Sequence, residues 1–200
     1  MKKLILLLVI LNLFQNLSLK AQYVTIPDAH FVTFLQTNFP GCMVGNQMDT
    51  TCAAITGATT LNCANDSIAD LTGVQYFDNL DTLYCSNNLL ISLPPLPSLL
   101  TVLGCDYNQI TSLPSLPNTL TDLECYDNSL TSLPILPSSL LTLSCSYNQL
   151  TSLPPLPNSL QTLDCLSNQL TNLPTLPNSI NVVQCCFNLL TKSTYFAKFA

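Results

Sequence analysis

Seven cysteines at regular intervals are the most obvious reactive groups in this sequence. They lie at positions 63, 85, 105, 125, 145, 165 and 185, so the first interval is slightly longer and all the later intervals are identical. Regularly spaced thiols can bridge neighbouring units, bind a metal as thiolates, or serve only as small buried apolar side chains. Which of these applies depends on the element that carries them.

Asp122 and Glu124 form the second candidate, because a pair of carboxylates can cleave a glycosidic bond. Such a pair needs an enclosed site that excludes water and raises the pKa of one carboxyl group. The chain has one histidine, His30, which we interpret as a surface residue, and it has no metal-ligand cluster or glycine-rich phosphate loop. We therefore predict that the protein is not an enzyme and has no catalytic residue, cofactor or metal.

Short strands are the elements that position these residues. From Cys85 to Cys185 an asparagine follows each regular cysteine at the third position, from 88 to 188, and this unbroken period indicates a repeat architecture. Around one cysteine, Leu143 and Cys145 alternate with Ser144 and Ser146. This period of two places the first pair inward and the serines outward on a strand. Because the units are alike, their strands are predicted to pair in parallel as one sheet.

All seven regular cysteines then point into the stack, and we interpret them as small buried hydrophobic residues. Neighbouring strands lie about 4.8 Å apart, a separation that permits a disulfide, but parallel side chains hold the sulfurs poorly for one. A few strained bridges or a thiolate metal ladder remain as alternatives. Cys186 follows Cys185 directly and must face outward. The repeated asparagine is predicted to turn its amide inward and satisfy backbone groups.

The second half of each unit is predicted to be extended. From Leu80 onward the units carry segments such as LPSLP and LPILP, whose prolines forbid a helix. We expect polyproline-like chain that returns along the convex side with its leucines inward.

Each unit also fits the consensus L-x-x-L-x-L-x-x-N-x-L, with cysteine at the third leucine. IPDAHFVTFL followed by LNCANDSIADLTGVQYFDNLDTLYCSNN resembles the cap and first repeats of secreted bacterial leucine-rich repeat proteins, including the internalin-like group. The units from Leu80 onward resemble the bacterial LPX subfamily, known from secreted effectors. The resemblance implies a leucine-rich repeat solenoid, or horseshoe, of about seven units with a small N-terminal helical cap. Calcium binding is not carried over, because the cap loop offers only Asp49 as an acid.

The sequence divides into four predicted segments. Residues 1–21 resemble a cleaved signal peptide, with an uncleaved membrane anchor as the alternative. Residues 22–57 form the cap, in which Asp28 begins a helix and Cys42 and Cys52 bridge or remain free thiols. Residues 58–191 are the repeats. Residues 192–200 are either a tail that folds over the last repeat or, as we favour, the point where a longer protein is truncated.

Function is expected on the concave face, at the outward strand positions and the strand ends. From Gln22 onward the chain has eleven acids and only two lysines, and it has no arginine anywhere, so nucleic-acid binding is not expected. Acids and tyrosines gather on the concave face, and the candidate ligand-binding residues are Tyr84, Asp106, Tyr107, Asp122, Glu124, Tyr126, Asp127, Tyr147 and Asp164. We predict a secreted or cell-surface protein-interaction or adhesion module. The alternatives are glycan binding, a structural spacer, and a face whose acids only maintain solubility.

Overall fold

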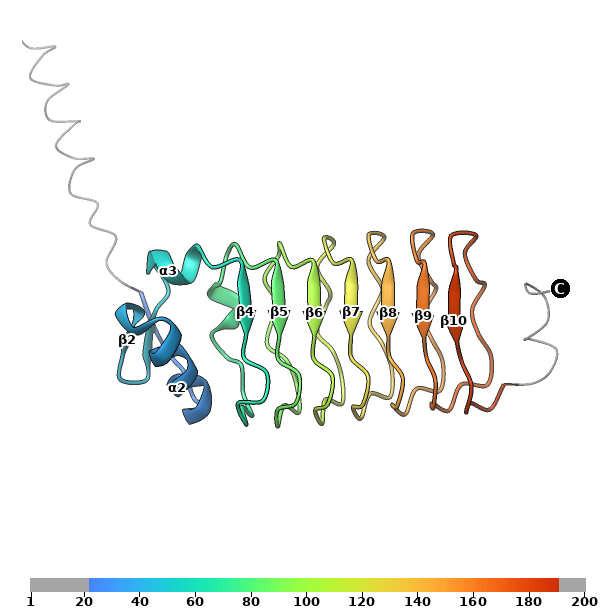
Figure 1. Ribbon diagram of the computed structural model, residues 1–200, viewed down its shortest axis with the longest axis horizontal. Coiled ribbons are helices and arrows are strands. Elements are labelled where there is room, and N and C mark those ends of the chain that lie inside the picture. Colours follow the sequence, from blue (N-terminus) through green and yellow to red (C-terminus); the bar gives the residue numbers. More distant parts are fainter. Residues whose placement is uncertain (1–21, 191–200) are drawn as a thin grey trace, which may run out of the picture.

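The computed structural model describes residues 22–190, which form a small cap and one row of stacked repeats (Figure 1). The predicted signal peptide (1–21) and the predicted tail (192–200) lie outside the described residues. The predicted solenoid of short parallel strands with an extended return side is confirmed.

The cap combines a three-stranded antiparallel sheet, ordered β1-β3-β2, with a ten-residue helix. Its strands are β1 (Tyr23–Thr25), β2 (Met43–Val44) and β3 (Gln47–Asp49), and the helix is α2 (Ala29–Asn38). Asp28 begins the helix as predicted, because its Oδ1 accepts a hydrogen bond from the Phe31 N–H at 2.8 Å. Its Oδ2 accepts another from the N–H of Ala69 at 2.8 Å. One carboxylate therefore caps the helix and ties the cap to the first repeat.

Apolar packing and a disulfide complete the cap. The Phe31 ring is fully buried, and the Phe39 ring packs edge-on against Phe77 of the first repeat, with ring centroids 5.5 Å apart. A disulfide joins Cys42 and Cys52, whose Cα atoms are 5.6 Å apart. These cysteines lie at two short turns of helix, η1 (Pro40–Cys42) and α3 (Ala53–Thr56). The cap thus covers the apolar end of the stack, as a solenoid requires.

Seven three-residue strands pair in parallel to form the main sheet (Figure 1). They are β4 (Thr60–Asn62), β5 (Thr82–Tyr84), β6 (Val102–Gly104), β7 (Asp122–Glu124), β8 (Thr142–Ser144), β9 (Thr162–Asp164) and β10 (Val182–Gln184). Equivalent residues lie opposite one another, so that Leu123 pairs with Leu143 and Leu143 with Leu163. All three of these leucines are fully buried.

The inward cysteines are buried and unbridged in the described chain, which confirms their interpretation as small hydrophobic residues. Their side chains are 0–5% exposed. Burial raises the pKa of the Cys63 and Cys165 thiols to about 12 and that of Cys125 well above its usual range. The thiols therefore stay protonated at neutral pH. Cys186 is exposed, as the alternation predicts.

The repeated asparagines form a ladder of buried and half-buried amides that turn inward, as predicted. Asn148 donates from Nδ2 to the carbonyls of Cys125, Cys145 and Ser146 at 3.0, 3.2 and 3.1 Å. Its Oδ1 accepts from the N–H of Leu130 at 2.8 Å. The same pattern recurs at 108, 128, 168 and 188. Each amide thus satisfies polar groups of its own unit and of the preceding one.

The return side is extended from the second unit onward, but the first unit differs. A 3₁₀ turn, η2 (Val74–Tyr76), follows Gly73, whose backbone has a φ of 119°. A Cβ atom at Gly73 would lie 2.5 Å from Cδ1 of Ile26 in the cap, so glycine permits this close approach. In later units a hydroxyl joins neighbouring return segments, as when Ser159 donates to the carbonyl of Leu140 at 2.6 Å.

Candidate functional site

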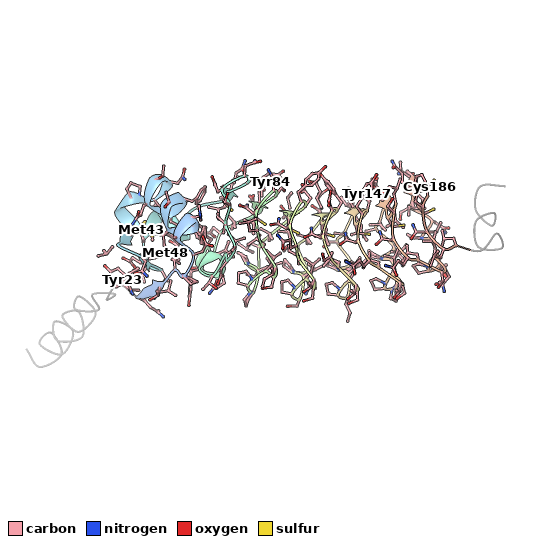
Figure 2. The ribbon with its side chains drawn as sticks, turned by 90° about the horizontal axis from the view of Figure 1, so that it is seen from below. Tyr23, Met43, Met48, Tyr84, Tyr147 and Cys186 are labelled. Carbon is pink, nitrogen blue, oxygen red and sulfur yellow. A yellow bond between two sulfur atoms is a disulfide. The ribbon has the colours of Figure 1, made fainter. Side chains whose placement is uncertain are left out.

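Outward residues of the main sheet lie in rows that cross the strands, and we call this surface the strand face. One row runs Gly104, Glu124, Ser144 and Asp164. The residues just after the inward cysteines form a second row, which includes Asp106, Tyr126 and Ser146. The next residues along form a third row, which includes Tyr107, Asp127 and Tyr147. Adjacent members of a row come from strands about 4.8 Å apart. Tyr84, Tyr147 and Cys186 lie along one long side of the stack (Figure 2).

The third row has an unusual backbone conformation. Tyr107, Asp127 and Tyr147 have φ values of 51°, 51° and 53°, in the left-handed region. Their N–H groups donate to carbonyls of the following unit at 3.2, 3.0 and 2.9 Å. The interstrand hydrogen bonding therefore continues through these residues and holds their side chains at defined positions. Asparagine and aspartate tolerate this conformation well, whereas tyrosine adopts it at a cost.

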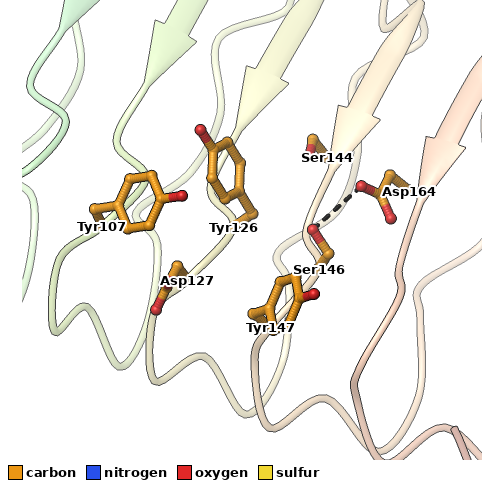
Figure 3. Close-up of a pocket in the computed structure, with 7 residues that line it drawn as sticks. All are labelled: Tyr107, Tyr126, Asp127, Ser144, Ser146, Tyr147 and Asp164. Carbon is orange, nitrogen blue, oxygen red and sulfur yellow. Dashed lines mark hydrogen bonds between the residues drawn. The ribbon is translucent and has the colours of Figure 1, made fainter. Parts of the chain in front are cut away.

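A hollow of about 380 Å³ opens where these rows meet (Figure 3). Its lining residues come from the third to the sixth repeat unit and are Tyr107, Tyr126, Asp127, Ser144, Ser146, Tyr147 and Asp164. Tyr107 and Tyr147 are about half exposed, and the Tyr107 ring packs edge-on against Tyr126 with centroids 5.2 Å apart. The hollow thus has aromatic walls and carboxylates at two places on its rim.

Comparison with known proteins identifies the architecture. Residues 138–178 match a family model described as leucine-rich repeats in two copies. A Shigella effector leucine-rich repeat domain is 30% identical with a TM-score of 0.59, and the match covers 70% of this chain and 74% of that one. This chain belongs to the leucine-rich repeat family.

Two structures of YopM show a similar repeat. YopM from Yersinia enterocolitica WA-314 is 38% identical with a TM-score of 0.64, covering 65% of this chain and 29% of that one. YopM from Yersinia pestis, described as a leucine-rich effector protein, is 37% identical with a TM-score of 0.63. That match covers 65% of this chain and 37% of that one. The leucine-rich repeat chain thus spans about a third of the YopM structures. No curated protein matches it significantly. None of the helices within residues 22–190 is long and apolar enough to cross a membrane.

Five of the nine candidate residues of this leucine-rich repeat protein meet in the hollow, namely Tyr107, Tyr126, Asp127, Tyr147 and Asp164. The alternation along the strand predicts that Ser144 and Ser146 face outward, but neither was among the predicted ligand-binding residues. Their small side chains leave the space that larger residues would fill. The Ser146 hydroxyl also donates to Asp164 Oδ2 at 3.2 Å, and Asp164 Oδ1 accepts from the Leu166 N–H at 3.1 Å. Both oxygens of Asp164 are therefore held in place.

Asp106 does not match its expected role as an open ligand contact, because it is only 5% exposed. Its Oδ1 accepts from the Ser86 hydroxyl at 2.7 Å, and it is also hydrogen-bonded to the Tyr126 side chain. Burial, and then the charge and hydrogen bond of Asp106, raise the pKa of Tyr126 to about 12. The phenol stays protonated and donates to the carboxylate. Asp106 thus orients Tyr126 at the edge of the hollow.

The other three candidates lie on the strand face beside the hollow. The Tyr84 ring lies over Gly104, where an added Cβ would be 2.7 Å from Tyr84 Cδ1. Asp122 accepts from the Thr121 hydroxyl at 2.8 Å. Glu124 is exposed, and desolvation followed by the negative charges of Asp106 and Asp122 raises its pKa. Residues 22–190 contain no lysine or arginine that could offset this negative charge.

Proposed function

We propose that this chain is a secreted or cell-surface recognition module that binds a protein partner on its strand face and has no catalytic role. The observation that carries the proposal is the row Tyr107, Asp127 and Tyr147 beside the hollow. Two half-exposed tyrosines occupy left-handed backbone positions there. Asn87, Ser167 and Phe187 occupy the equivalent positions in other units, so the stack fixes this backbone conformation but does not require a tyrosine there. Residues kept in unfavourable conformations are characteristic of functional sites.

The composition of the hollow supports a macromolecular partner. Tyrosine is enriched among the few residues that carry most of the binding energy in protein interfaces, and it combines an apolar ring with a hydroxyl that can form hydrogen bonds. The surrounding Ser and Asp groups offer further hydrogen bonds at the rim. The leucine-rich repeat family consists largely of protein-interaction domains, and the effector structures that resemble this chain belong to it.

Secretion is supported by the predicted signal peptide and by the Cys42–Cys52 disulfide, since disulfides persist in oxidising compartments. The proposed organisation is a signal peptide at 1–21, a cap at 22–57 and repeats at 58–191. The absence of catalysis is supported by Glu124, whose side chain is exposed. A carboxylic acid that acts as a general acid needs a site that excludes water.

Glycan binding is the second candidate, and the exposed rings of Tyr107 and Tyr147 favour it, because a sugar ring can stack on an aromatic face. A spacer role within a larger surface protein requires no ligand and predicts that substitutions on the strand face leave every interaction unchanged.

Two matched double variants test the proposal. Tyr107→Asn with Tyr147→Asn removes both rings and introduces the residue that already occupies position 87. Ile91→Asn with Ile135→Asn removes two residues that are 62% and 89% exposed elsewhere on the stack. Each protein is immobilised and exposed to extracellular and envelope proteins, and the retained partner is purified and its Kd measured. A glycan array is probed in parallel.

We expect the tyrosine double variant to weaken partner binding at least tenfold and the isoleucine double variant to leave it within twofold, in line with the usual weight of aromatic contacts. Equal binding by all three proteins would contradict the proposal. Binding on the glycan array alone, abolished by the tyrosine double variant, would assign the surface to glycans instead.

A further inference from the structure

We infer that the surface formed by Tyr107, Asp127 and Tyr147 receives a basic side chain, arginine or lysine, from the partner. The inference rests on the proposed function and specifies the chemistry of the partner. It combines three features of this row, which are its spacing, its unpaired carboxylate and the charge of its surroundings.

The spacing suits one side chain between two rings. Tyr107 and Tyr147 hold the same position in units that are two apart, so about 9.6 Å of sheet separates their backbones. A group in van der Waals contact with a ring on each side requires about 7–8 Å. Asp127 lies between the two tyrosines (Figure 3). A planar guanidinium placed over this row is therefore within reach of a tyrosine ring and of the Asp127 carboxylate.

The carboxylate between the rings is free. Asp127 is exposed, and its side chain makes no hydrogen bond or ion pair with any other residue of the described chain. Asp164 on the other side of the hollow differs, because Ser146 and the Leu166 N–H already hold both of its oxygens. The hollow thus offers one available acceptor and one fixed negative charge. A cation is attracted to the face of a tyrosine ring, and arginine can add bidentate hydrogen bonds to a carboxylate.

The charge of the surface selects a cation over a neutral or acidic ligand. Glu124 lies one strand away from Ser144 in the same row as Asp164, so carboxylates flank the hollow on both sides. Residues 22–190 hold all eleven acids of the chain and no lysine or arginine. A neutral sugar would stack on the rings but leave this repulsion in place, and an acidic ligand would increase it. A basic side chain relieves it.

The test uses the isotope-labelled chain and three blocked tripeptides, Ac-Gly-Arg-Gly-amide and its lysine and citrulline counterparts. Citrulline has nearly the shape of arginine but no charge. Binding is followed through the backbone amide signals of Tyr107, Asp127 and Tyr147. Asp127→Asn is the test variant, because asparagine tolerates the left-handed backbone there. Asp78→Asn is the matched control, since it removes an equal charge from an exposed residue outside the hollow.

We expect saturable shifts at this row with the arginine and lysine peptides and at least fivefold weaker binding of the citrulline peptide. Asp127→Asn should weaken arginine binding at least fivefold, whereas Asp78→Asn should leave it within twofold. Equal affinity for arginine and citrulline, shifts confined to other surfaces, or no shifts would overturn the inference. A partner that binds the tyrosine double variant more weakly but binds Asp127→Asn as tightly as the native chain would contradict the inference of a basic side chain. The proposed function would still stand.

Discussion

Replacing Asn148 with alanine should destabilise the protein severely although no ligand is involved. The Asn148 side chain is 9% exposed and is the shared partner of backbone groups in two units. Its loss leaves the buried N–H of Leu130 and the carbonyl of Cys125 without a side-chain partner. An unsatisfied buried polar group costs about 1–3 kcal/mol, so the expected loss is about 2–5 kcal/mol. That is a large share of the roughly 5–15 kcal/mol typical of a folded domain.

Urea denaturation followed by circular dichroism measures this loss, and amide hydrogen exchange locates it. The Leu130 N–H should lose protection in Asn148→Ala, because its acceptor at 2.8 Å has been removed. Asn148→Asp should be at least as damaging, since a carboxylate cannot donate to the three carbonyls that the amide contacts. Asn158→Ala, at an exposed position on the return side, serves as the control and should change stability by less than about 0.5 kcal/mol.

A cost of less than about 1 kcal/mol for Asn148→Ala, the typical contribution of a single hydrogen bond, or unchanged protection at Leu130 would contradict this prediction. Either result would mean that water or a backbone shift satisfies these groups as well as the amide does. The ladder would then be dispensable.

The further predictions concern the scaffold. Thiol reagents should label Cys186 in the native protein and the seven inward cysteines only in denaturant. The free energy of unfolding should fall as pH rises above about 8.5, because the thiols with raised pKa stay protonated in the folded protein but ionise in the unfolded chain. Gly104→Ala should lower the melting temperature in the native background but not in Tyr84→Ala, since the clash with the Tyr84 ring is then absent. Replacing Cys42 and Cys52 with alanine should cost about 2–3 kcal/mol, measured by urea denaturation; a loss under about 0.5 kcal/mol would show that the cap does not depend on its bridge.

The fold was readable from the sequence because its signals repeat. The alternation around Cys145 and the asparagine that follows it recur in register, and each recurrence supports the same strand and the same buried amide. The turn Val74–Tyr76 was not predicted, because it occurs in the first and longest unit and depends on packing between the cap and Gly73. A feature present only once has no repetition to support it.

Only part of the candidate binding surface could be predicted from the sequence. Alternation identifies which side chains point outward from the sheet. It does not show which of them are covered by side chains of the adjacent units. Asp106 is outward by alternation, yet Ser86 and Tyr126 bond to it and it is buried. Ser146 is likewise 4% exposed although its position is outward. These outcomes depend on side chains of adjacent units, which lie a whole repeat away in the sequence.

The left-handed row could not be recognised from residue types. Asparagine and aspartate suggest such a backbone, but tyrosine does not, and Tyr107 and Tyr147 occupy it with φ values of 51° and 53°. The stack holds these tyrosines where an isolated chain would avoid the conformation. This is the basis for regarding the rings as functional rather than structural.

Tyrosine modification in the presence of the partner tests the recognition surface most directly. Tyr23 in the cap, Tyr107 and Tyr147 are 49%, 51% and 56% exposed, so the free protein should be nitrated at all three at similar rates. The protein is then saturated with the partner purified in the binding experiment. The partner should slow nitration of Tyr107 and Tyr147 at least fivefold and leave the nitration rate of Tyr23 unchanged. Protection of Tyr23 alone, or equal rates at all three with and without the partner, would contradict a recognition surface on the strand face.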